Sequence, residues 1–380
     1  MRHIPANRPT RARTAANASQ PSVRSRRLRL RLPVAIGMAL VTGASLSACG
    51  TGASAAGLPS TTSDLVKQAK KEGTVAWSAP KPQSQMQPAI DLFEKKYPGI
   101  KIKYTNTKAP DQVSQLKMEE AARKVSVDVA NAGGLTVLPS LQLADDVDWA
   151  KYGIAKENVF EKNLVYIWSV PKVWAYNTDK VKPADLPKTW DDLLDPKWSG
   201  GKVSAESRAS FMTVWDLDPS LGEAKSLAWA EKFAAQNPHF TPNTTQSEAP
   251  IESGQVSIGT SLINLVLQAQ KKGAPVAVAP LSPTNANESY LYVPKGAPHP
   301  AAAVLLTRFL SSDAAQSVLA KTYNSRIPVD TDCSDPGDNA VLKSICDAHL
   351  KWFGTKTLDD YKSFSSYFPK AEKALGTDVG

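Results

Sequence analysis

The chain has few of the residues on which catalysis and metal binding most often depend. Its 380 residues include 3 cysteines and 4 histidines. No Cys-x-x-Cys, His-Glu-x-x-His or Gly-x-Ser-x-Gly motif occurs, so the common patterns of zinc sites and serine hydrolases are absent. After residue 48 the histidines are His239, His299 and His349, and two of these neighbour a proline. We therefore expect no catalytic residue, no metal site and no cofactor.

Acidic residues are absent from the first 48 positions, which carry nine arginines. The whole chain has 45 basic and 36 acidic residues and a formal net charge of +9. Removing the nine arginines leaves 36 residues of each sign, so the rest of the chain is neutral. The positive charge belongs to a leader, and it gives no reason to expect nucleic acid as a partner.

The leader has the parts of a bacterial export signal. A basic region extends to Arg31, and an apolar run follows over residues 32–48. This run is shorter than a typical membrane span and contains more small residues. It ends in Leu46-Ser47-Ala48-Cys49, which resembles the lipobox of bacterial lipoproteins. The resemblance implies a signal peptide over residues 1–48 and acylation of Cys49. The alternative is a plain secretory cleavage site, and the twin-arginine and general secretory routes both stay open.

Two further features describe a protein held outside the cytoplasmic membrane. Residues 49–63 are small and polar and predict a flexible tether. In an oxidising compartment, Cys333 and Cys346 would close a short disulfide loop. The alternative is a pair of free thiols.

The remaining residues alternate between helical and strand patterns. Residues 64–71 predict a helix behind the caps Thr62 and Ser63, and residues 100–104 (IKIKY) alternate as a strand does. The same rhythm returns over residues 202–280. It predicts an α/β fold with mainly parallel sheets and helices on both faces. Ligands of such sheets bind beyond the carboxyl ends of the strands.

Several blocks resemble the extracellular solute-binding proteins of bacterial ABC importers, in the group related to ferric-iron, polyamine and phosphonate binders. They are "LFEKKYPGIKIKY", "WAYNTDKVKPADLPKTWDDLLDPKWSGGKVSAES", "SGQVSIGTS" and "YVPKGAPHPAAAVLLTRFLSSDAAQSVLAK". The resemblance implies a two-lobed type II periplasmic-binding-protein fold with two hinge-crossing strands, near residues 173–178 and 290–294. Lobe 1 would hold residues 64–173 and about 291–380, including C-terminal helices, and lobe 2 would hold residues 174–290.

Polar or aromatic residues at the predicted strand ends and the hinge are the candidate ligand groups. They are Ser78, Gly133, Trp174, Tyr176, Ser207, Arg208, Ser210, Thr260 and Ser261. Serine hydroxyls and an arginine at a helix N-terminus suit an oxyanion. Seven of the nine have a structural alternative: a helix cap for Ser207, Thr260 and Ser261, a solvent pair with Glu206 for Arg208, a turn for Gly133, and core packing for Trp174 and Tyr176. Trp190 and Trp198 are assigned to packing.

The expected function is that of a membrane-anchored receptor that captures a small solute and passes it to the permease subunits of an ABC importer. We expect a monomer, and a phosphonate or another organic oxyanion as the ligand. The ferric-binding members use neighbouring tyrosines, whereas this chain has residues 262–265 (LINL) there. A polyamine, held by Glu206, Asp145, Asp146 and Tyr176, and a ferric chelate are the alternatives within the fold. A secreted hydrolase and a surface interaction protein are the alternatives outside it.

Overall fold

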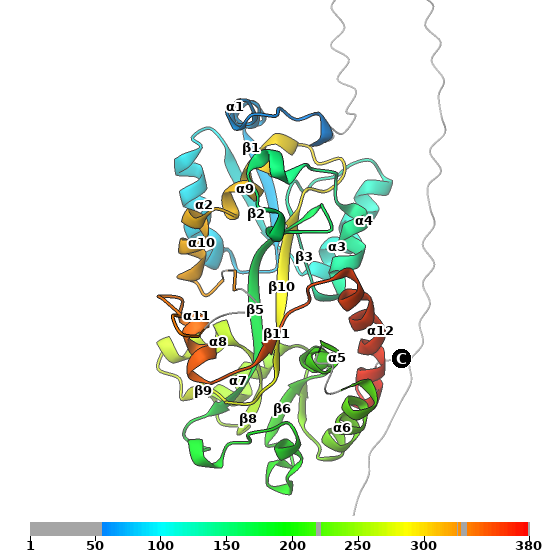
Figure 1. The fold of residues 1–380 in the computed structure, drawn as a ribbon, viewed down its shortest axis with the longest axis vertical. Helices are drawn as coiled ribbons and strands as arrows, with labels where there is room; N and C mark the ends of the chain where they lie inside the picture. The colour runs from blue at the N-terminus through cyan, green and yellow to red at the C-terminus, as the bar shows by residue number, and fades with distance from the viewer. Residues whose placement is uncertain (1–54, 218–221, 325, 328–332, 379–380) are drawn as a thin grey trace, which may run out of the picture. The chain divides into compact units, whose positions relative to one another are not determined.

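The computed structural model describes residues 55–217, 222–324, 326–327 and 333–378 (Figure 1). The predicted signal peptide, Cys49 and the first tether residues lie outside the described residues. Of the helices within these ranges, none combines the length and apolar character that a membrane span requires.

One group of elements, which we call lobe 1, is built on two short parallel strands and their neighbours. Its strands are β1 (Thr74–Ala79), β2 (Lys101–Asn106), β3 (Ala130–Gly133) and β4 (Val159–Phe160). Its helices are α1 (Thr62–Glu72), α2 (Gln83–Lys96), α3 (Ala109–Ala121), α4 (Val137–Leu143), α9 (Pro300–Leu310) and α10 (Asp313–Ala320).

The second group, lobe 2, repeats the alternation of strands and helices. Its strands are β6 (Val203–Glu206), β7 (His239–Thr241), β8 (Ile258–Leu262) and β9 (Val276–Val278). Its helices are α5 (Thr213–Leu217), α6 (Glu223–Ala235), α7 (Thr244–Glu252) and α8 (Ile263–Lys271). The tail adds α11 (Ala340–Asp347), β11 (Trp352–Phe353) and α12 (Leu358–Ala374).

Two long strands, β5 (Leu164–Asn177) and β10 (Thr284–Tyr292), belong to both lobes. The first part of β5 pairs with β4 and β10, and its last part, from Lys172, pairs with β8 and β9. The register therefore places the passage between lobes near residues 169–172 of β5 and 286–289 of β10. Both passages come a few residues before the predicted ones.

The strand directions refine the sequence prediction. Strand β1 is parallel to β2, and β6 is parallel to both β7 and β8, as the alternation predicts. The crossing strands β5 and β10 are antiparallel to each other, and β5 is also antiparallel to β8. The reason is the chain path: β5 leads the chain out of lobe 1 and β10 brings it back, so the two cannot run the same way.

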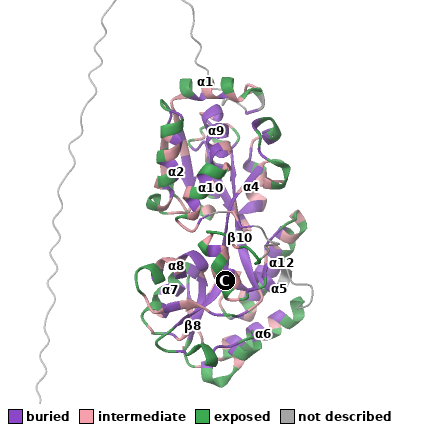
Figure 2. Ribbon diagram, turned by 60° about the vertical axis from the view of Figure 1, so that its left-hand side comes forward, coloured by how far each residue is buried: buried purple, intermediate pink, exposed green. Residues whose placement is uncertain are grey.

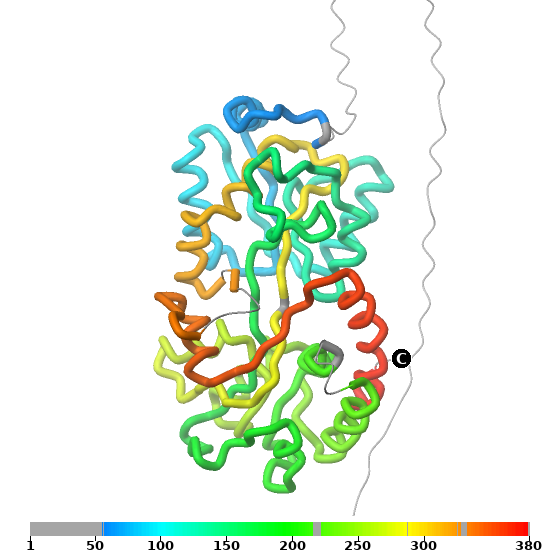
Figure 3. The backbone as a smooth tube through the Cα atoms, viewed as in Figure 1, coloured from blue at the N-terminus to red at the C-terminus, as the bar shows by residue number. Residues whose placement is uncertain are grey.

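The tail returns along the crossing strands. Strand β11 pairs with the start of β10, and the backbone then continues into α12 (Figure 3). Helix α12 buries Tyr361 against the lobe 1 aromatic residues and Tyr367 in the lobe 2 core. A disulfide joins Cys333 to Cys346 just before and within α11.

Each lobe has its own apolar core, seen as the buried interior of the ribbon in Figure 2. Lobe 2 is held by an aromatic cluster in which Trp190 contacts Trp174, Trp215 and Trp229 with ring centroids 5.1–5.5 Å apart. Such pairs stabilise by about 0.5–1.5 kcal/mol each beyond the area they bury. Trp190 and Trp198 are both buried, in agreement with their assignment to packing.

The start of the described chain differs from the predicted tether. Ala55 is buried and its amide donates to Asp145 Oδ2 at 2.7 Å, while Tyr152 Oη donates to the Pro59 carbonyl at 3.1 Å. The first helix begins at Thr62 and is capped by Thr61, not by Thr62 or Ser63, because the Thr61 hydroxyl accepts from the Asp64 amide. Residues 55–63 are therefore attached to lobe 1.

Candidate functional site

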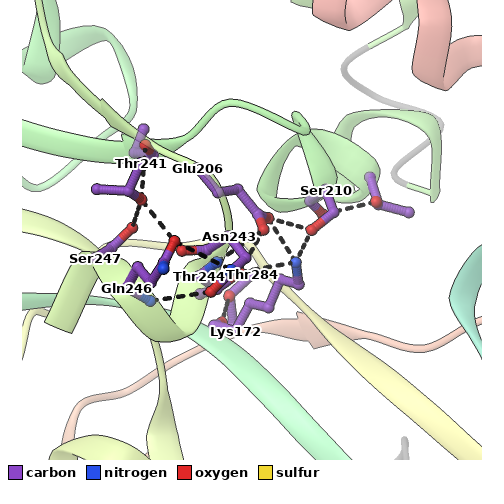
Figure 4. A network of polar contacts seen from close by, with 11 residues as sticks. Lys172, Glu206, Ser210, Thr241, Asn243, Thr244, Gln246, Ser247 and Thr284 are labelled. Carbon is purple, nitrogen blue, oxygen red and sulfur yellow. Dashed lines mark hydrogen bonds and ion pairs between the residues drawn. The ribbon is translucent and has the colours of Figure 1, made fainter. Parts of the chain in front are cut away.

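A buried polar network lies where the lobe 2 strands end, beside crossing strand β5 (Figure 4). Lys172 extends from β5, and its Nζ lies 2.6 Å from Glu206 Oε1 at the end of β6. The Ser210 hydroxyl contacts both of these groups. Thr244, at the start of α7, donates its amide to Glu206 Oε2 at 3.2 Å and accepts from Lys172 Nζ at 3.3 Å. Three chain segments, around residues 172, 206–210 and 244, thus meet around one ion pair.

Local backbone features bring these side chains together. Strand β6 ends at Glu206, and Ala209 then takes a left-handed conformation with φ of 52°. A non-glycine residue pays about 1 kcal/mol or more for that conformation. The resulting sharp turn directs Ser210 back toward Lys172. The Asn243 side chain caps α7 by accepting from the Gln246 amide at 3.1 Å, which fixes Thr244 beside Glu206.

The ion pair is almost entirely removed from water, since the side chains of Lys172 and Glu206 are 4% and 5% exposed. Burial on its own would raise the pKa of Glu206, but the Lys172 charge and the hydrogen bonds from Lys172, Ser210 and Thr244 lower it overall. Buried ion pairs are costly and give weak stabilisation compared with apolar packing. A pair kept at the strand ends of an α/β lobe is therefore a candidate for function.

Lobe 1 places a second lysine at the end of a strand. Lys81 follows β1 and immediately precedes α2, and the Tyr104 hydroxyl fixes its backbone by donating to the Lys81 carbonyl at 2.6 Å. Its Nζ lies 6.0 Å from the ring centroid of Trp168 on β5. Among the described residues no carboxylate pairs with Lys81, and burial lowers its pKa to about 8. No side chain caps α2, so Lys81 and the amides of that helix start form an electropositive point.

The predicted lobe 1 residues lie close to this point of the sheet. Ser78 is buried, and its backbone is fully used: its amide donates to Val129 and its carbonyl accepts from the Gln112 side chain. Gly133 ends β3, where an added Cβ would lie 3.1 Å from the Glu288 carbonyl oxygen. Gly133 is therefore required by close packing on β10, and the left-handed turn falls at Gly134, with φ of 54°.

The residues that follow β6, 207–210, are divided between the polar network and the protein surface. Ser210 joins the network, as described above. Ser207 is half-buried, and its backbone is held by Thr241 and by the hydroxyl of Thr377. Arg208 is exposed and influences Glu372, whose pKa is raised chiefly by burial and is lowered in part by Arg208. Glu206 pairs with Lys172, so it is not the solvent partner of Arg208 that sequence analysis left open.

The other candidates are buried in lobe 2. The Trp174 ring packs between Trp190, Phe211 and Phe233, and Tyr176 belongs to the same core, which is the packing alternative for both. The hydroxyl of Ser261 donates to Glu248. Thr260 Oγ1 is buried with no hydrogen-bond partner in the described part of the chain. Neither residue caps α8, which begins at Ile263 and has Leu262 at its N-cap position without a side-chain hydrogen bond.

Sequence reasoning missed Lys172, Lys81 and Thr244. Lys172 did carry a signal, because it is the one charged residue in the 14-residue strand LVYIWSVPKVWAYN. A charge inside an otherwise apolar strand predicts a buried partner. Lys81 lies between two prolines directly after β1. No local pattern marks Thr244, since it acts through a contact with Glu206, 38 residues away.

Other candidate chemistry is sparse in the described residues. Among them no group of three or more His, Cys, Asp or Glu side chains is arranged to hold a metal ion. His299 Nδ1 lies 2.9 Å from Asp128, but the same carboxylate accepts from the backbone amides of Ala76 and His299. This pair therefore ties the start of α9 to β1.

Comparison with known proteins defines the class. Residues 88–344 match the family model described as bacterial extracellular solute-binding protein, and the chain belongs to this family. It is 26% identical over 174 residues to the Fe(3+)-binding periplasmic protein of Serratia marcescens, a match that covers 45% of this chain. The match covers 51% of that relative, so the chain spans about half the length of the curated relative it matches.

Solved structures show the same fold at low sequence identity. Iron-bound HitA of Pseudomonas aeruginosa has a TM-score of 0.62 and 19% identity, over 80% of this chain and 99% of that chain. AgtB of A. tumefaciens R10 in complex with agropinic acid has the same TM-score, identity and coverage. The fold is the two-lobed type II periplasmic-binding-protein fold. The family is one of extracellular solute-binding proteins, which places this chain outside the cytoplasm.

Proposed function

We propose that this protein is a lipid-anchored, monomeric receptor that captures a small carboxylate- or phosphonate-bearing solute between its lobes and delivers it to the permease subunits of an ABC importer. The family supports the receptor role and favours binding over catalysis. The ligand class and the anchor are inferred from the residues themselves. The nine ligand positions predicted from the sequence remain part of the proposal, with Lys81, Lys172 and Thr244 added to them.

The observation that carries the ligand class is Lys81. Its side chain is half-buried, its ammonium lacks a carboxylate partner among the described residues, and it lies at the start of the uncapped helix α2. An unpaired, desolvated cation is costly unless an anion completes it. A carboxylate or phosphonate would accept hydrogen bonds from the ammonium and from free helix amides together.

The lobe 2 network supplies groups for the rest of the solute. Lys172, Glu206 and the hydroxyls of Ser210 and Thr244 form a rigid set of donors and acceptors. The unpartnered Thr260 hydroxyl lies on neighbouring strand β8. A solute that also carries hydroxyl or amino groups would be matched by this set, whereas a purely apolar one would leave it unsatisfied.

The two alternative ligands fit less well. A polyamine needs exposed carboxylates, but Glu206 is already paired with Lys172 and Asp145 holds the Ala55 amide. The relatives that bind iron favour a ferric chelate. Its iron would have to be held through the chelator, since the described residues present no metal-ligand cluster of carboxylate, imidazole or thiolate groups.

The test is a ligand screen with a matched variant. Carboxylates, phosphonates, polyamines and ferric chelates would be added to the protein while melting temperature and tryptophan fluorescence are recorded, and native mass spectrometry would look for a retained ligand. We expect hits among the anions, and we expect Lys81→Met to weaken them by at least about tenfold. Lys103→Met, at an exposed position on β2, is the control. Binding of polyamines alone, or full affinity in Lys81→Met, would exclude the proposed ligand class.

The anchor has its own test. Cys49→Ser should release the protein from the membrane fraction into the medium and remove the mass of the acyl chains, without changing ligand affinity. Retention of the Cys49→Ser protein in the membrane would contradict anchoring through that residue.

A further inference from the structure

A cavity of about 730 Å³ lies beside the crossing strands, away from the strand-end residues discussed above. Its walls include Phe160 of β4, Tyr166 of β5, Glu288 and Tyr290 of β10, and Thr355 of the tail. It therefore contacts both strands that join the lobes and the returning segment. A space of this size holds a small organic molecule.

None of the strand-end candidates lines the cavity. On β10, Glu288 and Tyr290 line it, whereas Ser289, between them, does not. Ser289 faces Gly133, since its Oγ lies 3.4 Å from the position of a Cβ on that glycine. Tyr290 instead packs with Phe160 and Tyr361. The cavity is thus separate from the proposed solute site.

Aromatic rings form much of the wall. The Tyr290 ring lies 5.4 Å from the Phe160 ring and 5.9 Å from the Tyr166 ring, measured between centroids. The hydroxyls of the two tyrosines are already engaged: that of Tyr166 with Ser169 and the Ile327 carbonyl, and that of Tyr290 with Tyr361. The rings are therefore held in place, and such surfaces attract cations.

A carboxyl group is built into the same wall. Glu288 is 5% exposed, and its Oε1 accepts from the Thr355 amide at 3.1 Å. Among the described residues no lysine or arginine forms an ion pair with it, and burial raises its pKa to about 8. The guanidinium of Arg326, also in the wall, is directed to the Ser311 carbonyl at 2.7 Å. A buried carboxyl without a cation is costly to ionise, and a bound ammonium would remove that cost.

From the cavity, its rings and its carboxyl, we propose a second ligand site that binds a small organic ammonium ion. The ammonium lies against the rings of Phe160, Tyr166 and Tyr290, and Glu288 supplies the countercharge. The site does not depend on the transported solute, because none of its residues belongs to the lobe 2 network or to the Lys81 region.

The experiment uses choline as the cationic probe and 3,3-dimethylbutan-1-ol as its neutral isostere. Each would be titrated into the mature protein by calorimetry, at a pH above the pKa of about 8 that burial gives Glu288. We expect choline to bind and the alcohol to bind at least about tenfold more weakly, since it lacks the charge. Equal affinity for both compounds, or no binding of choline, would overturn the proposal.

Variants distinguish the loss of choline binding at this site from a general disturbance of the fold. Glu288→Gln keeps an oxygen for the Thr355 amide and should weaken choline by at least about tenfold. Glu248→Gln, at another buried glutamate outside the cavity, should leave choline affinity unchanged. If Glu288→Gln does not fold, Phe160→Leu removes one ring at a half-buried position and should also weaken choline. Wild-type affinity in either cavity variant would refute the assignment.

The Lys81→Met variant distinguishes this proposal from the main function. It should lose the anionic solute and retain choline. Loss of both in a folded Lys81→Met protein would show that the two ligands share one site and would overturn the second site.

Discussion

Replacing Lys81 with methionine should make the protein more stable while it weakens solute binding. The pKa of Lys81 falls from 10.5 to about 8 on folding, and burial is the cause. One pKa unit corresponds to 1.36 kcal/mol, so keeping the charge at neutral pH costs the folded protein about 3 kcal/mol. Methionine has a similar length and no charge, and it removes this cost.

The pH dependence gives the sign of the effect. The folded pKa of Lys81 lies below the unfolded value, so the unfolded chain binds more protons between pH 8 and 10.5. The wild-type free energy of unfolding therefore gains about 3 kcal/mol from this group as pH rises through that window. Lys81→Met should exceed wild type by about 3 kcal/mol at pH 7, and the difference should vanish above pH 10.5.

Urea unfolding followed by tryptophan fluorescence, repeated across pH, measures this difference. Comparison with the exposed Lys103→Met removes any general effect of lost positive charge. The same proteins would be tested with the best anion from the ligand screen, which should protect wild type and not Lys81→Met. A Lys81→Met protein that is less stable than wild type at pH 7 would refute the account of a desolvated, uncompensated charge.

Three other changes have defined outcomes. Lys172→Met leaves Glu206 as a buried charge without a partner and should lower the free energy of unfolding by about 3–5 kcal/mol. Adding Glu206→Gln should recover part of this loss, and a double variant as unstable as Lys172→Met alone would contradict this. Cys346→Ser opens a disulfide loop with a sequence separation of 13 and should cost about 3 kcal/mol in urea unfolding; dithiothreitol should destabilise wild type and leave the variant unchanged. The pKa of Glu288 is raised from 4.5 to about 8, so the contribution of its protonated carboxyl to the free energy of unfolding is fully present below pH 4.5 and is lost as pH rises to about 8. Glu288→Gln should flatten the pH–stability curve between these values. An unchanged slope in the variant would count against the raised pKa.

Much of the fold could be predicted from the sequence because it rests on local patterns. The helical pattern of residues 64–71 and the alternation of residues 100–104 depend on neighbours along the chain, and both elements form, as α1 (Thr62–Glu72) and β2 (Lys101–Asn106). The order of these elements along the chain is enough to indicate an α/β architecture. Trp190 and Trp198 were likewise recognisable as packing residues.

The candidate site was only partly visible at this level. Polar residues after a strand mark the ligand edge of such sheets, which led to Ser210, and the structure places Ser210 in contact with Lys172 and Glu206. Trp174 and Tyr176 lie in the lobe 2 core, which is assembled from residues far apart in the chain, so the sequence alone does not show that they are buried.

What the sequence by itself determined is the succession of elements and the positions where strands give way to polar loops, because these depend on neighbours along the chain. Tertiary structure decided which charges meet and which do not. Lys172 and Glu206 are 34 residues apart, and only the pairing of β5 with lobe 2 strands brings them to 2.6 Å. Lys81 is left without a carboxylate among the described residues for the same reason. Whether a charged side chain is desolvated, and whether it has an ion-pair partner, depends on its folded surroundings, which no single segment encodes.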